Sequence, residues 1–181
     1  SNSGGSIMSS SYTIDDLRKD VAEGRIDTVL ACQVDMQGRL MGKRFQAEYF
    51  VESAWKETHS CNYLIATDME METVSGYKAT SWEKGYGDYT MKPDLSTLRV
   101  IAWLEGTALV LCDVDWEDGS PVVASPRQVL RRQVERVRAA GFEPMFGSEL
   151  EFYLLKESYA EAHAKHYRGL TPSVPYILDY H

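Results

Sequence analysis

Two glutamates that stand two positions apart, Glu149 and Glu151, are the residues of this sequence best placed to do chemistry. They lie in an apolar run of strand character over residues 145–155. Residues i and i+2 of a β-strand project from the same face, roughly 6.6 Å apart. Two carboxylates held beside apolar surface are costly unless a cation neutralises them, and Mg²⁺ and Mn²⁺ prefer carboxylate oxygens. The pair therefore predicts a divalent metal site; the alternatives are a solvated strand face or pairing with Arg and Lys.

The composition is that of an ordinary globular protein with an acidic balance. The 181 residues are 44% hydrophobic and 25% charged, and the net charge is −8. The negative balance argues against a nucleic-acid partner, and no apolar run approaches the length of a membrane span. The three cysteines, Cys32, Cys61 and Cys112, lack the spacing of a disulfide framework or a metal site. We therefore expect reduced thiols and a cytoplasmic protein.

The hydrophobic pattern predicts several strands and a few helices, which is an α+β fold. Strands are expected over residues 28–35, 39–45, 61–67, 98–103, 107–114 and 145–155, and helices over 13–23, 47–57, 126–140 and 158–167. Between two of the strands, residues 68–89 form a polar stretch that is too long for an ordinary connection, so a functional or mobile loop is expected there. The five arginines of the 126–140 helix are expected to form a solvated face.

Several sequence blocks, taken in order, resemble the glutamine synthetase family. They are DMQGRLMGKR at 35–44, DYTMKPDLSTLR at 88–99, CD at 112–113, DGSP at 118–121, SPR at 125–127 and GSELEF at 147–152. The resemblance implies a β-grasp-like amino-terminal domain over residues 13–117. It also implies that residues 118–181 are the truncated start of a larger α/β catalytic domain, of which they supply the opening helix and strand. Residues 1–12 are expected to be a cloning remnant followed by a disordered start.

The resemblance also implies a reaction and its cofactors. Members join the γ-carboxyl of glutamate to ammonia or a small amine through a γ-glutamyl phosphate, using ATP and two divalent cations, Mg²⁺ or Mn²⁺. By the resemblance, Glu149 and Glu151 each serve a different metal site. Family members assemble as homo-oligomeric rings whose active sites lie between subunits. Metal ions that bridge carboxylates and phosphate oxygens fit the needs of phosphoryl transfer.

One departure from the family pattern concerns the loop that follows Thr67. Bacterial members carry an Asp-Gly-Ser-Ser motif there, whose Asp helps to deprotonate ammonium, whereas this chain reads DMEMET over residues 68–73. Asp68 is the candidate for that catalytic task, and a solvated acidic loop is the alternative. The change suggests a γ-glutamyl ligase for a larger cationic amine, a polyamine or an amino alcohol. Glu70 and Glu72 would attract that amine, and Tyr77 and Trp82 would pack its carbons.

A second departure from the family pattern is that the nucleotide-binding and glutamate-binding motifs do not occur in these 181 residues. The nucleotide-binding and glutamate-binding residues of the family are expected beyond residue 181, so the 181-residue chain is expected to be inactive by itself. Gly85 and Gly87 do not form a phosphate loop, and His163 with His166 is a poor metal pair. A non-catalytic relative that keeps the fold for assembly or binding is the alternative from another functional class.

Overall fold

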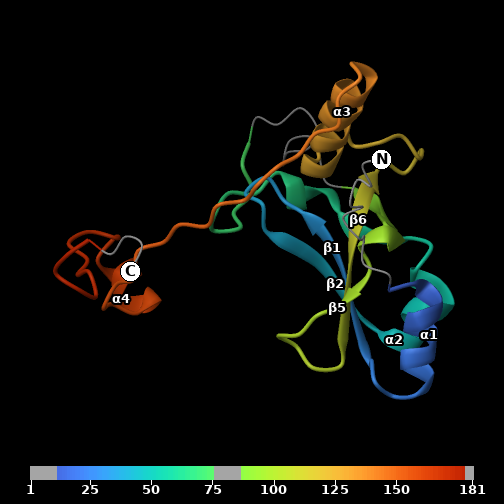
Figure 1. The fold of residues 1–181 in the computed structure, drawn as a ribbon, viewed down its shortest axis with the longest axis horizontal. Coiled ribbons are helices and arrows are strands. Elements are labelled where there is room, and N and C mark those ends of the chain that lie inside the picture. The colour runs from blue at the N-terminus through green and yellow to red at the C-terminus, as the bar shows by residue number, and fades with distance from the viewer. Residues whose placement is uncertain (1–11, 76–86, 178–181) are drawn as a thin grey trace, which may run out of the picture. The chain divides into compact units, whose positions relative to one another are not determined.

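The computed structural model describes residues 12–75 and 87–177 (Figure 1). Their contacts form two compact units that divide between Glu143 and Pro144. The first unit is built on a β-sheet, and the second contains one short helix, α4, over Tyr159–Ala164. The fold is mixed α+β, as the sequence predicts. A domain boundary near residue 118 stays a prediction, because it concerns the domains of the complete family protein.

A six-stranded sheet forms the centre of the first unit (Figure 1). Its strands are β1 Thr28–Val34, β2 Leu40–Gln46, β3 Thr58–Cys61, β4 Asp88–Pro93, β5 Arg99–Val100 and β6 Thr107–Asp115. The spatial order is β2-β1-β6-β4-β3, and β5 also pairs with β6. The pairing of β1 with β6 is parallel, and the other pairings are antiparallel. The predicted hairpin of β1 and β2 is therefore confirmed.

One face of the sheet is covered by the helices α1, Ile14–Ala22, and α2, Ala47–Tyr49, which continues as a π-helix, η1, over Phe50–Ala54. The buried core on this side joins Leu17 and Phe50 of the helices to Val29 and Val110 of the sheet. The α1 helix begins with a capping box, in which Thr13 and Asp16 bond reciprocally. This arrangement satisfies backbone N–H groups that a helix start leaves free, so the predicted helix start is confirmed.

The opposite face of the sheet carries charged residues near the end of β6. Because strand side chains alternate between faces, Asp113 and Asp115 point away from the core that contains Cys112 and Val114. Helix α3, Pro126–Ala139, contributes the arginines that pair with Asp113 on this face. Its N-cap Ser125 accepts a hydrogen bond from the backbone of Gln128, which confirms the predicted start.

Four of the predicted elements differ from the structure. The expected strand at 61–67 is instead a 3-10 helix, η2, over Asn62–Ile65, and the strand at 98–103 shortens to β5. The run at 145–155 is not a strand, and the predicted 158–167 helix is only the short α4. The first two residues of β4, Asp88 and Tyr89, fall in the predicted 68–89 loop, and Tyr89, Thr90 and Met91 of this strand are all buried. Three consecutive buried residues lack the alternation of a half-buried strand, so no period of two marks β4 in the sequence.

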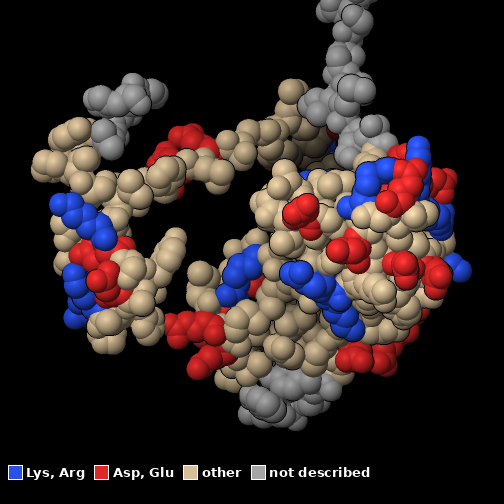
Figure 2. All heavy atoms as spheres, turned by 90° about the horizontal axis from the view of Figure 1, so that it is seen from below, with Lys and Arg blue, Asp and Glu red and all other residues tan. Residues whose placement is uncertain are grey.

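The surface of the first unit carries both signs of charge. Figure 2 shows basic and acidic side chains interspersed on the viewed face of this unit rather than gathered by sign. Such a face does not offer the continuous basic stripe that nucleic-acid binding requires. Among the described residues, no helix is both long enough and apolar enough to cross a membrane.

Candidate functional site

Glu149 and Glu151 lie in a segment of the second unit without helix or strand. Both side chains are exposed, and neither takes part in an ion pair within residues 12–75 and 87–177. No group of three His, Cys, Asp or Glu residues in the described part of the chain is arranged to hold a metal ion. The pair fits Mg²⁺ or Mn²⁺ in the kind of donor, because carboxylate oxygens suit hard cations, but it supplies too few ligands for a complete site. Their role as metal ligands stays a prediction.

The predicted strand around these glutamates is wrong for a physical reason. A strand is held by backbone hydrogen bonds to a neighbour, and in the described residues this run pairs only at an isolated bridge between Leu155 and Pro172. The apolar residues that gave the run its strand character are consequently exposed, as Leu150 at 92% and Phe152 at 84% show. The residues of this run favour a strand, but no strand among the described residues pairs with it.

Asp68 closes a tight loop through its own carboxylate. Its Oδ1 accepts hydrogen bonds from the backbone N–H groups of Glu70, at 2.9 Å, and Glu72, at 3.0 Å. The backbone N–H of Asp68 donates to the carbonyl of Glu72, and Met71 adopts a positive φ of 69° inside the loop. Asp68 is half-buried, and no described residue donates a hydrogen bond to its Oδ2. One carboxylate oxygen therefore shapes the loop, while the second accepts no hydrogen bond from residues 12–75 and 87–177.

Arg39 ties this loop to the turn between β1 and β2. Its Nη1 donates to the carbonyl of Met69 at 2.6 Å, and its Nη2 donates to the carbonyl of Asp68 at 2.7 Å. Its Nε pairs with Asp35 at 2.7 Å. The Gln37 side chain adds a hydrogen bond from Nε2 to the carbonyl of Thr67 at 2.9 Å. The turn of the predicted hairpin therefore also positions the candidate catalytic loop, because Arg39 bonds both to the loop carbonyls and to the buried carboxylate of Asp35.

Asp35 holds the guanidinium of Arg39 in position. Its side chain is completely buried, and its Oδ1 accepts hydrogen bonds from the backbone N–H groups of Gln37 and Arg39. Burial by itself raises the pKa of Asp35, but the hydrogen bonds from Arg39 and Gln37 and the charge of Arg39 outweigh it and lower the pKa below its ordinary value. The ionised carboxylate is therefore the form that holds Arg39 in place.

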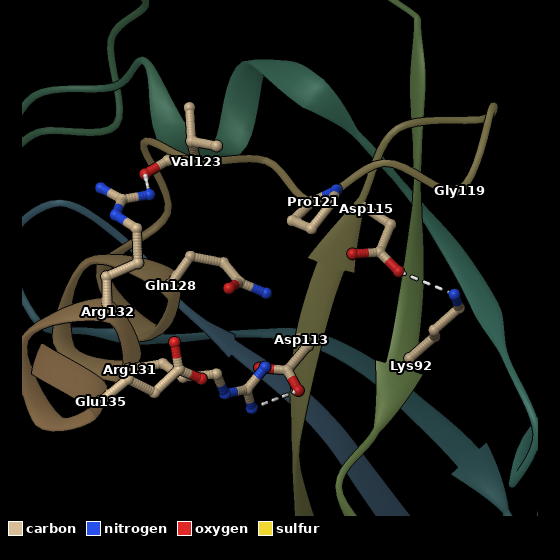
Figure 3. A pocket seen from close by; sticks show the side chains of 10 residues that line it. All are labelled: Lys92, Asp113, Asp115, Gly119, Pro121, Val123, Gln128, Arg131, Arg132 and Glu135. Carbon is tan, nitrogen blue, oxygen red and sulfur yellow. Dashed lines mark hydrogen bonds and ion pairs between the residues drawn. The ribbon is translucent and has the colours of Figure 1, made fainter. Parts of the chain in front are cut away.

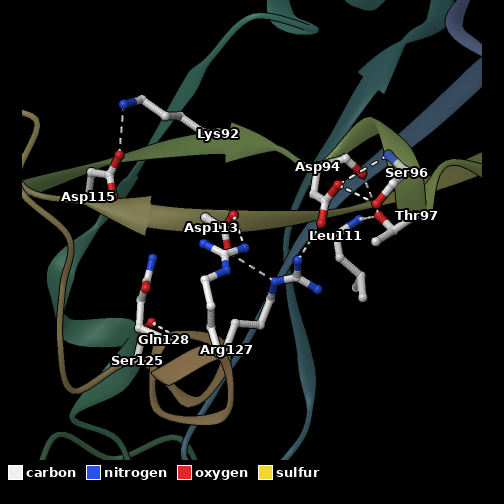
Figure 4. A network of polar contacts seen from close by, with 11 residues as sticks. Lys92, Asp94, Ser96, Thr97, Leu111, Asp113, Asp115, Ser125, Arg127 and Gln128 are labelled. Atoms are coloured by element: carbon white, nitrogen blue, oxygen red, sulfur yellow. Dashed lines mark hydrogen bonds and ion pairs between the residues drawn. The ribbon is translucent and has the colours of Figure 1, made fainter. Parts of the chain in front are cut away.

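The basic face of α3 is not simply solvated. Arg127 donates from Nη2 to Asp94 at 2.7 Å and from Nε to Asp113 at 3.1 Å (Figure 4). Arg131 donates from Nη2 to Asp113 at 2.7 Å (Figure 3). The hydrogen bond to Asp113 is the main reason that the pKa of Arg131 is raised. The prediction of a solvated face is therefore wrong for these two arginines, which fasten α3 to β6.

A cavity of about 540 Å³ lies next to this network, bounded by β4, β6, α3 and the turn that contains Gly119 and Pro121 (Figure 3). Asp115, which is only 7% exposed, pairs at its rim with Lys92 at 2.8 Å. The hydrogen bond to Asp115 raises the pKa of Lys92. Gln128 of α3 is 8% exposed, and Figure 3 shows its side chain extending into the cavity.

The structure tests only some of the remaining candidates from the sequence. Tyr77, Trp82 and Gly85 lie outside the described residues. His163 contacts the ring of Tyr167 and belongs to no metal-binding group within the described ranges. All three cysteines are free, as predicted, and burial raises the pKa of Cys112 to about 12, which makes its thiol unreactive.

Comparison with known proteins gives concordant matches. Residues 123–175 match the glutamine synthetase catalytic domain. The γ-glutamylethanolamide synthetase GlnA4 of Streptomyces coelicolor is 49% identical over 168 residues, which are 92% of this chain and 36% of that protein. A glutamate–isopropylamine ligase of a Pseudomonas species is 38% identical over 157 residues, which are 86% of this chain and 34% of that protein.

A solved structure shares the fold. The complex of GmaS with ADP superposes with a TM-score of 0.52 at 22% identity, over 69% of this chain and 26% of that one. The chain thus spans about a third of the length of the two ligases that it matches.

Proposed function

Because the chain belongs to the glutamine synthetase family, we propose that it is a portion of an ATP-dependent ligase that joins the γ-carboxyl of glutamate to an amine. The observation that carries the proposal is the 49% identity over 168 residues to a γ-glutamylethanolamide synthetase. A second relative is named for ligation of isopropylamine. Both names favour a small organic amine, such as an amino alcohol, over ammonia as the acceptor.

The loop of Asp68 supports an amine acceptor. An amine is protonated at neutral pH and must lose a proton before its nitrogen can attack an acyl phosphate. In our proposal Oδ2 of Asp68 takes that proton, while Oδ1 remains bonded to the loop backbone. Glu70 and Glu72 are exposed in the same loop, and their charge would draw a cationic amine towards it.

The family generally uses ATP and divalent metals, and the candidate ligands in this chain are Glu149 and Glu151. When bound, the metal would neutralise the charge of the triphosphate during phosphoryl transfer. A β-grasp-like first domain and a homo-oligomeric ring with active sites between subunits also belong to the proposal, and the family resemblance supports both. A cytoplasmic location completes it, and the three free cysteines support that location.

The test uses the complete polypeptide that the gene encodes, with the 181-residue chain assayed alongside it. ADP release is measured with glutamate and ATP in the presence of ethanolamine, isopropylamine, putrescine or ammonium. We expect an organic amine to give a higher kcat/KM than ammonium, and we expect no turnover from the 181-residue chain alone. A preference for ammonium would refute the organic amine, and no turnover by the complete polypeptide with any amine would indicate the non-catalytic alternative.

Variants of the loop separate the two roles of its acids. Asp68→Asn should lower kcat by about a hundredfold, the usual contribution of a positioned base. Glu70→Gln, a matched change two residues away, should raise KM for a cationic amine and leave kcat near the wild-type value. An Asp68→Asn enzyme with wild-type kcat would remove Asp68 from the reaction.

A further inference from the structure

Two charged residues that line the cavity beside α3, Arg132 and Glu135, form no ion pair with a described residue. Lys92 is paired with Asp115, and Arg131 is paired with Asp113. In the described part of the chain, Arg132 donates only to the backbone carbonyl of Val123, and Glu135 has no ion-pair partner. Two lining groups of opposite charge, three positions apart on one helix, are therefore open to a ligand.

Gln128 supplies a polar group inside the cavity. It is 92% buried, since only 8% of it is exposed, and its side-chain amide forms no hydrogen bond with any described residue. Figure 3 shows this amide pointing into the cavity, between the side chains of Arg132 and Asp115. The amide atoms of Gln128 are not among the fully buried unpaired side-chain atoms of the described residues, so they remain open to the cavity, where a ligand can replace water as their hydrogen-bond partner. The amide donates through Nε2 and accepts through Oε1, which suits a ligand with both kinds of group.

The charge of the lining restricts the ligand further. Three bases, Lys92, Arg131 and Arg132, face three acids, Asp113, Asp115 and Glu135, so the formal charges cancel. A multiply charged anion or cation would find half of the ionic groups repulsive. A molecule that carries one charge of each sign finds a counterpart for both.

We propose that this cavity binds a small zwitterion with one carboxylate and one ammonium group, a ligand of the amino-acid class. The carboxylate lies towards Arg132, the ammonium lies towards Glu135, and the amide of Gln128 bonds to the ligand between them. The volume of about 540 Å³ is within the range of small-molecule sites. The site is separate from the Asp68 loop, and the inference does not depend on the proposed ligase reaction.

In the experiment, the complete polypeptide is titrated with glycine, and NMR monitors the side-chain amide signal of Gln128 during the titration. We expect a saturable shift with a Kd in the millimolar range. Acetate and methylammonium, which each carry only one of the two charges, should bind at least about tenfold more weakly, because each leaves one lining charge and part of the amide unsatisfied. Equal binding of acetate would indicate a simple anion site and overturn the proposal, as would the absence of a saturable shift.

Variants test the assigned contacts by calorimetry with glycine. Gln128→Leu and Glu135→Gln should each weaken binding by about tenfold. Gln133→Leu is the matched control, because Gln133 lies on the same helix, is exposed and bonds only to Arg136 in the described structure. Glu135 is exposed, so its variant remains informative if Gln128→Leu does not fold. Wild-type affinity in a folded Glu135→Gln or Gln128→Leu protein would refute the site.

Discussion

Arg39 joins the turn between β1 and β2 to a loop thirty residues further along the chain. Its guanidinium reaches two loop carbonyls and one buried carboxylate at once, through Nη1, Nη2 and Nε. A lysine has a single nitrogen and cannot donate in these three directions from fixed positions. The position of Asp68, the candidate catalytic residue, therefore depends on a side chain outside its own loop.

Replacing Arg39 should loosen the loop and weaken the fold. We expect Arg39→Ala to lower the free energy of unfolding by about 2 kcal/mol, because buried Asp35 loses its charged partner. Urea unfolding measures the loss, and amide hydrogen exchange at Glu70 and Glu72 should become faster. Arg44→Ala, an exposed change on β2, is the control and should stay within about 0.5 kcal/mol of wild type. Equal exchange rates in the two variants would show that Arg39 does not hold the loop.

Asp35 should make stability depend on pH. Because its pKa is lower in the folded protein than in the unfolded chain, its contribution is complete above the unfolded pKa of about 3.9. The contribution is lost as the pH falls through the folded pKa. We expect the difference in unfolding free energy between wild type and Asp35→Asn to be largest at neutral pH and to shrink below about pH 4. Urea unfolding over this pH range measures it, and a constant difference would contradict the assignment.

Helix α3 illustrates what a local signal predicts and what it misses. Ser125, Pro126 and Gly141 mark the ends of the helix in the sequence, because an N-cap, a first-turn proline and a left-handed glycine act within one turn. The partners of its arginines could not be predicted in the same way. Asp94 is 33 residues from Arg127, and only the pairing of β4 with β6 brings Asp94 and Asp113 to the same end of the helix.

Loss of the ion pairs between Arg127 of α3 and the two aspartates should lower the free energy of unfolding more than an ordinary surface substitution does. Arg127→Ala removes two charged hydrogen bonds and should lower the free energy of unfolding by about 2 kcal/mol. Arg136→Ala, on the same helix, removes one exposed contact with Gln133 and should change stability by less than about 0.5 kcal/mol. Thermal and urea unfolding of both variants give the comparison. Equal losses would indicate that the Asp94–Arg127–Asp113 network does not fasten the helix.

The chain as a whole carries an apolar segment that its own described residues leave uncovered. Phe146, Leu150, Phe152 and Tyr153 are each at least 80% exposed in the second unit. Contiguous apolar surface of this kind promotes association with another surface, and an unpaired extended backbone offers hydrogen bonds as well. The same segment contains both glutamates that are predicted to bind metal.

We expect the 181-residue chain to self-associate as its concentration rises. The double change Leu150→Lys and Phe152→Lys should shift the distribution towards the monomer, because it removes two of the most exposed apolar side chains. Light scattering during size-exclusion chromatography measures the mass. Tyr159→Lys is the control, since Tyr159 is 94% exposed on α4 but lies outside the segment. A monomeric wild-type chain at all concentrations would contradict this expectation.

The sequence by itself determined the features that act over a few residues. The start of α1, the β1–β2 hairpin, the ends of α3 and the mixed α+β class follow from local hydrogen bonding and hydrophobic period. The free thiols follow from the number and spacing of the cysteines. The ordered motifs also placed the chain in its family, because they are spread along nearly all of it.

Only the tertiary structure decided which distant residues meet. It buried Asp35, brought Arg39 to the Asp68 loop, and set Gln128 against Asp115 in a cavity. It also left the 145–155 run without a sheet in the described residues, whatever its strand preference. The physical reason is that pairing between strands and helices depends on contacts between residues far apart in the chain, and no local pattern encodes their partners.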